Sequence, residues 1–125
     1  CCMKRLALLF LGVAICAPGL AQAQRVSPMK AGNFARICAR ATGHSVCDAY
    51  LSGLADGVSL SKISARNEGD ANAPAGFCVP VQETTDAMRA KVLTWLKAHT
   101  DALNKPVGES IFTALHDSYP CSAKQ

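Results

Sequence analysis

The sequence is poor in aromatic residues and carries only a small excess of positive charge. Phe, Trp and Tyr make up 6% of its 125 residues, and the formal net charge is +4 at pH 7. Proteins that bind nucleic acid usually combine a concentrated basic surface with aromatic side chains on which bases stack. The basic residues here are dispersed along the chain, so we expect no nucleic-acid partner.

The sequence also lacks the motifs of common metal and catalytic sites. No C-x-x-C, H-x-x-x-H, H-E-x-x-H or G-x-S-x-G pattern occurs, and there is no glycine-rich phosphate loop. His99 and His116 fall in the last turns of predicted helices, where a histidine interacts with the terminal carbonyl groups. We therefore expect no metal, no cofactor and no catalytic residues, and we interpret the protein as a non-enzyme.

Only one stretch is strongly apolar, and it is too short to cross a bilayer. It runs from Leu6 to Cys16, whereas a membrane-spanning helix needs about 20 residues. Lys4 and Arg5 precede this stretch, and the small-residue motif Ala21-Gln22-Ala23 follows it. This order is typical of a cleaved secretory signal peptide. We predict a signal peptide over residues 1–23, cleavage after Ala23, a periplasmic location, and no membrane association of the mature protein.

An alternative for the same segment is a lipoprotein signal ending at Cys16. The sequence Val13-Ala14-Ile15-Cys16 is a weak match, because Ile15 stands where a small residue is required. Cys1 and Cys2 precede Met3, the expected initiator, and we interpret them as an artefact.

Four cysteines remain in the predicted mature chain, and they are expected to form disulfides. An even number of cysteines in a small exported chain favours disulfides over zinc, which would require closer cysteine spacing. Four cysteines allow three pairings. We favour one bridge closing a short turn and another tying a long segment to the C-terminus, which pairs Cys38 with Cys47 and Cys78 with Cys121.

Helical spacing of apolar residues predicts an all-α fold, a small bundle of about four to five short helices with two disulfides. No segment alternates apolar and polar residues as a strand would. We expect residues 24–32 to form a flexible leader and residues 33–125 to form one domain. The expected helices span 34–41 after an Asn33 cap, about 46–64, from a Thr84 or Thr85 cap to about 99, and from Pro106 to before Pro120.

Two features of the 46–64 helix require an explanation. Gly53 and Gly57 lie four residues apart, and glycine weakens a helix unless another backbone approaches closely. We expect helix packing inside the monomer, with a dimer contact as the alternative. Asp56 lies between these glycines, and we expect it to be partly buried and paired with an arginine, with a partner contact as the alternative.

In the helix that follows the cap at Thr84 or Thr85, the basic residues Arg89, Lys91 and Lys97 are predicted to face water.

Several short motifs follow one another along the predicted mature chain. They are Cys38, Cys47–Gly53, Asp56, Cys78-Val79-Pro80, Trp95–His99, Ala114-Leu115 and Tyr119-Pro120-Cys121. Together they resemble the Rap/Tai family of type VI secretion immunity proteins, in which a Y-x-x-G helix, a C-[VI]-P turn, a W/Y-L-x-x-H-P helix end and an A-L…[FY]-P-C terminus occur in this order. Thr100 stands where the family usually has proline, and the segment from Ala65 to Phe77 is longer and more polar than usual.

The resemblance implies a periplasmic, helical and often dimeric protein. Characterised relatives bind a peptidoglycan-cleaving amidase that the type VI secretion system delivers, and they block its active-site groove. The resemblance therefore implies an amidase toxin as the partner and a possible homodimer. The alternatives are a periplasmic helical chaperone and an orphan binding protein without a toxin partner.

An inhibitor of a cleft enzyme needs a protrusion that enters the cleft, and one segment of the chain suits this role. The loop expected between about Ala65 and Gly76 has no helical periodicity and is rich in turn-forming residues. We predict that its charged and amide side chains bind the partner. These residues are Arg66, Asn67, Glu68, Asp70 and Asn72.

Overall fold

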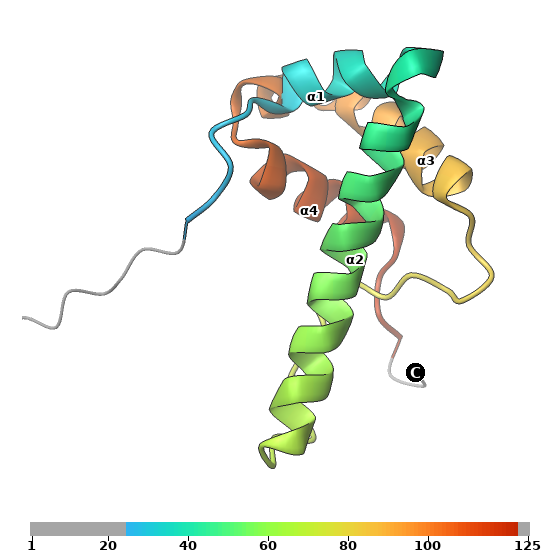
Figure 1. Cartoon of the computed structure of the whole chain (residues 1–125). Helices are drawn as coiled ribbons and strands as arrows, with labels where there is room; N and C mark the ends of the chain where they lie inside the picture. Colours follow the sequence, from blue (N-terminus) through green and yellow to red (C-terminus); the bar gives the residue numbers. More distant parts are fainter. Residues whose placement is uncertain (1–24, 123–125) are drawn as a thin grey trace, which may run out of the picture.

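The computed structural model describes residues 25–122, and this part of the chain folds into helices, with one long connection, residues 68–84, between α2 and α3 (Figure 1). It contains no β-strand, so the predicted all-α fold is confirmed. The predicted signal peptide and its cleavage site lie outside the described residues. The α-helices are α1 (Ala31–Cys38), α2 (His44–Asn67), α3 (Thr85–Ala98) and α4 (Val107–Ser118), and the 3-10 helices are η1 (Ala41–Gly43) and η2 (Thr100–Asn104).

The hydrophobic core lies between α1, α3, α4 and one side of the N-terminal half of α2. Figure 1 shows these helices gathered at one end of the molecule, while the rest of α2 projects away from them. The apolar residues of α4 recur at helical spacing, and four of them are fully buried, as their spacing predicts. The largest buried side chains of the core are Phe34, Leu51, Val92, Leu96, Val107, Ile111 and Leu115.

The first helix begins earlier than the sequence predicts. Lys30 is the N-cap residue of α1, so Asn33 is not a cap but lies within the helix. The start of α1 is held by backbone contacts with the chain before α4. The Ala31 amide donates to the Lys105 carbonyl at 3.0 Å, and the Val107 amide donates to the Met29 carbonyl at 2.8 Å. These long-range contacts decide the boundary, and local capping preferences do not reveal them.

Both predicted disulfides are present. Cys38 and Cys47 join α1 to α2 with a Cα–Cα distance of 5.2 Å, and both side chains are buried in the core. Cys78 and Cys121 join the segment before α3 to the segment after α4 with a Cα–Cα distance of 4.9 Å. The Cys78 amide also donates to the Tyr119 carbonyl at 2.8 Å, so the same two segments are paired through their backbones.

The third helix begins at the predicted cap, but one of its basic residues is not where the sequence predicts. Thr84 caps α3 by accepting a hydrogen bond from the Ala87 amide at 3.1 Å. Arg89 is buried and does not face water. It forms ion pairs with Asp48 of α2 and with Asp86, the latter at 2.6 Å. The charge on Arg89 is thus neutralised by two carboxylates, which allows its burial.

The aspartate that pairs with arginine is therefore Asp48, and the prediction for Asp56 is wrong. Asp56 is exposed and forms no ion pair within the described part of the chain. Because α2 begins at His44, Asp48 lies one turn into the helix, on the side that faces α3. Both aspartates belong to the same helix, and only the packing of α3 distinguishes them.

A second polar network fastens the start of α3 to the end of α4. Glu83 accepts hydrogen bonds from Lys91 at 2.6 Å and from the Tyr119 hydroxyl at 2.9 Å. The Lys91 ammonium also lies 4.4 Å from the centre of the Tyr119 ring. The hydrogen bond from Lys91, followed by that from Tyr119, lowers the pKa of Glu83. The carboxylate therefore stays ionised and keeps both partners in place over a wide pH range.

Candidate functional site

The predicted partner-binding residues lie at the projecting end of α2. This helix continues to Asn67, so Arg66 and Asn67 belong to its last turn and not to a loop. Only Cys47 and Leu51, both in the N-terminal half of α2, are fully buried. The structure brings the five predicted residues together at one exposed tip, which we call the α2 tip. Its members are Arg66, Asn67, Glu68, Asp70 and Asn72, and all five are exposed.

Local hydrogen bonds give the α2 tip a defined backbone. Gly69 has φ +98°, a conformation that glycine adopts without strain. Its amide donates to the Arg66 carbonyl at 3.0 Å, and the Asp70 amide donates to the Ala65 carbonyl at 2.9 Å. This pair of bonds is a Schellman motif, which ends the helix and reverses the chain. The Asp70 side chain then accepts from the Asn72 amide at 3.2 Å, so the turn continues in an ordered form.

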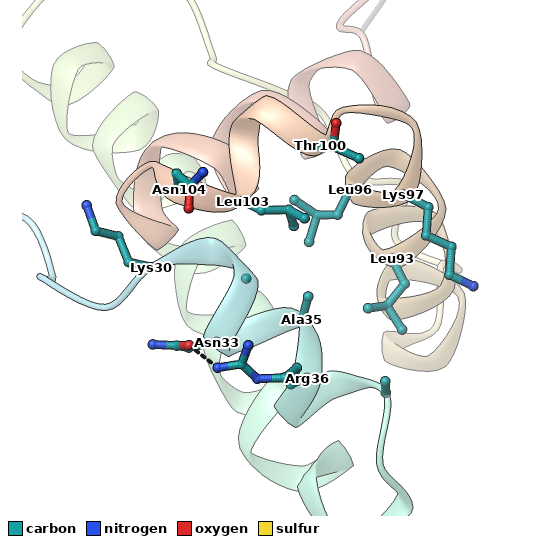
Figure 2. Close-up of a pocket in the computed structure, with 12 residues that line it drawn as sticks. Lys30, Asn33, Ala35, Arg36, Leu93, Leu96, Lys97, Thr100, Leu103 and Asn104 are labelled. Carbon is teal, nitrogen blue, oxygen red and sulfur yellow. Dashed lines mark hydrogen bonds between the residues drawn. The ribbon is translucent and has the colours of Figure 1, made fainter.

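A groove on the other side of the core was not predicted from the sequence. It lies between α1, α3 and η2 and has a volume of about 760 Å³ (Figure 2). We call it the α1–α3 groove. Its floor consists of aliphatic side chains, of which only one is fully buried. The floor residues are Ala35, Leu93, Leu96 and Leu103.

The rim of the α1–α3 groove is basic. Lys30, Arg36 and Lys97 line it, and no aspartate or glutamate does. Figure 2 shows Lys30 and Lys97 at opposite ends of the view, with the leucines between them and Arg36 on the α1 side. None of the three cations forms an ion pair within residues 25–122. Arg36 hydrogen-bonds only to the neutral amide of Asn33 on its own helix, so its charge is not neutralised.

A third feature is an exposed apolar face on α2, opposite the core. Gly53 and Gly57 do not pack against another helix of the monomer, because a Cβ atom added to either would meet nothing within 4 Å. The intramolecular packing that we expected is therefore wrong. Seven of the exposed positions of α2 recur at alternating spacings of three and four residues, and we call these seven the outer face of α2. They are Val46, Ala49, Gly53, Asp56, Leu60, Ile63 and Asn67.

The described residues offer no grouping suited to metal binding. No cluster of three or more His, Cys, Asp or Glu side chains that could hold a metal occurs among residues 25–122. The His99 ring nitrogen contacts the Trp95 carbonyl at 2.8 Å, which is the predicted role at the end of a helix. His116 instead contacts the Gly76 carbonyl at 2.6 Å and so holds the segment that precedes Cys78. Both histidines are explained by structural contacts.

Within residues 25–122, no helix combines the length and the apolar composition that crossing a bilayer requires.

The chain matches the sequence model of one known protein family. The sequence model of the Rap1a immunity proteins matches residues 30–121, which include all four helices and both disulfides. No curated protein and no solved structure matches the chain.

Proposed function

The chain belongs to the Rap1a immunity protein family, and from that premise we propose that it binds and blocks a peptidoglycan-cleaving amidase of the type VI secretion system. Family membership supports immunity to a secreted effector, and the match over residues 30–121 is the observation that carries the proposal. The amidase as the specific target follows from the resemblance described above. In this proposal the protein acts by binding and not by catalysis.

We place this action in the periplasm. Two disulfides support the placement, because they persist in oxidising compartments and are rare in the cytosol. In this proposal the segment 1–23 is removed after Ala23 during export.

The α2 tip is the proposed inhibitory element. A blocking protein gains affinity when the inserted segment is already in its bound conformation, since less entropy is lost on binding. The Schellman motif at Gly69 and the Asp70–Asn72 turn provide such a preformed backbone. The tip lies at the end of a helix that projects from the core, as Figure 1 shows, so it can enter a cleft without hindrance from α1, α3 or α4.

The first prediction concerns the α2 tip. Replacing Arg66, Asn67, Glu68, Asp70 and Asn72 together by serine is expected to weaken amidase binding at least about 100-fold, because a few central residues dominate such interfaces. Helicity should be unchanged, because all five side chains are exposed. Isothermal titration calorimetry with a type VI peptidoglycan amidase from the same organism, and circular dichroism, measure the two effects.

A matched control replaces two exposed residues of another turn, Val81 and Gln82, by serine. This variant should bind as the parent does. Undiminished binding by the five-residue variant would show that the inhibitory contact lies elsewhere. If the parent protein does not bind the amidase but prevents aggregation of other proteins at low pH, the chaperone alternative is favoured.

We also propose that the protein forms a homodimer through the outer face of α2. The alternating three- and four-residue spacing is that of a helix seam that packs against another helix. Leu60 and Ile63 are 62% and 47% exposed, which is unusual for large aliphatic residues on a helix without a partner. Gly53 carries no side chain and a Cβ atom there would meet nothing within 4 Å, so a second helix can approach α2 closely at this position.

In the proposed dimer the α2 helices of the two copies run antiparallel and cross at Gly53, where the two-fold axis lies. Val46 and Leu60 each lie seven residues from Gly53, so Val46 of one copy meets Leu60 of the other on both sides of the axis. Asp56 lies three residues from the axis, so the two Asp56 positions are six residues apart, or about 9 Å along the helices. The two α2 tips then lie at opposite ends of the dimer, where each can bind one effector.

The second prediction tests this dimer. Leu60→Glu would place a carboxylate against Val46 of the other copy and is expected to yield a monomer in sedimentation velocity. Ser59→Glu introduces the same side chain at the neighbouring exposed position, outside the seam, and should leave the dimer intact. A parent protein that sediments as a monomer at every accessible concentration would contradict the proposal.

A further inference from the structure

We propose that the α1–α3 groove binds a short acidic peptide segment of a partner protein, with aliphatic side chains on the groove floor and carboxylates at the basic rim. This site goes beyond the proposed function, since none of its residues belongs to the α2 tip or to the outer face of α2.

The floor of the groove provides the apolar part of the recognition. Ala35, Leu93 and Leu103 remain half-buried, although each belongs to an element that packs against the core. Gly32 keeps α1 close to η2 at one end, since a Cβ atom there would lie 3.2 Å from the Leu103 carbonyl oxygen. The volume of about 760 Å³ falls in the range of sites that bind ligands of peptide-fragment size.

The rim provides the charge part of the recognition. Arg89, Lys91 and Lys105 each form ion pairs with carboxylates of the same chain. Lys30, Arg36 and Lys97 form no ion pair among the described residues, and all three surround one apolar floor. A binding site whose rim carries charges of one sign favours partners of the opposite charge and speeds their association. A ligand with several carboxylates complements this arrangement.

The remaining lining residues favour a peptide over other anions. The side-chain amides of Asn33 and Asn104 both donate and accept hydrogen bonds, as a peptide backbone requires. No aromatic residue lines the groove, so nucleic-acid bases would have no surface on which to stack. Because the cations stand at both ends and along one side, the groove suits several carboxylates and not a single one.

The test is an NMR titration of the isotope-labelled, disulfide-bonded protein. The probe is a capped hexapeptide of alternating leucine and glutamate. Saturable chemical-shift changes are expected at Ala35, Leu93 and Leu103, and they should weaken as salt is raised. The same peptide with glutamine in place of glutamate should bind at least about tenfold more weakly.

Variants of the rim complete the test. Combining Lys30→Gln, Arg36→Gln and Lys97→Gln should weaken peptide binding about tenfold or more, which corresponds to three exposed charge interactions of modest size. Lys62→Gln removes a charge from α2, outside the groove, and should have no effect. Absence of saturable shifts, equal binding of the glutamine peptide, or shifts confined to the α2 tip would each overturn the proposal. Amidase binding by the rim variant reports separately on the proposed function.

Discussion

Replacing Cys78 and Cys121 together by alanine is expected to lower the free energy of unfolding by about 4 kcal/mol. The two cysteines are 43 residues apart. The intact disulfide closes this long loop in the unfolded chain and lowers its conformational entropy, which stabilises the folded state by comparison. For a domain of this size, such a loss corresponds to a decrease in Tm of at least about 15 °C. Urea unfolding followed by circular dichroism measures it.

The single variant Cys78→Ala is the matched control. It removes the same bridge, so its stability should equal that of the double variant to within a small error. The segment that loses its anchor includes Phe77, which is buried against Phe112 at a ring-centroid distance of 5.4 Å. A Tm unchanged from the parent protein would show that the backbone bond from Cys78 to Tyr119 and the core contacts suffice without the bridge.

Features that depend on residues close together in the sequence, such as buried helix faces and helix caps, could be predicted. The apolar spacing of α4 identifies its buried residues, because a single helix face decides their position. Thr84 is recognisable as a cap because its bond to the Ala87 amide spans only three residues. The cysteine pairing favoured from the sequence, with one bridge closing a short turn and the other tying a long segment to the C-terminus, is the pairing present.

Features that depend on the placement of one helix against another were not predictable. Whether Arg89 faces water or the core depends on the distant Asp48, and no periodicity within α3 reveals that pairing. The exposure of Gly53 likewise depends on how the other helices pack, because none of them contacts α2 at this position. The α1–α3 groove has lining residues from three separate elements, so its only signal in the sequence was Leu96 beside Lys97 on α3.

Truncating Phe34 to alanine is expected to cost about 4 kcal/mol of stability, as for other fully buried aromatic residues. The Phe34 side chain is 2% exposed and its ring centroid lies 4.8 Å from that of Tyr50 on α2. Helix α1 has eight residues, too few to form a stable helix by itself, so its position depends on such tertiary contacts. Thermal and urea unfolding monitored by circular dichroism measure the loss.

Phe112→Ala removes the same number of atoms at a site that is 37% exposed and should cost about 1 kcal/mol. The comparison separates burial from side-chain size. Because α1 forms one wall of the α1–α3 groove, Phe34→Ala should also reduce peptide binding under conditions where the protein remains folded, whereas Phe112→Ala should not. Equal losses of stability in the two variants would contradict the assignment of Phe34 as the contact that fixes α1 on the core.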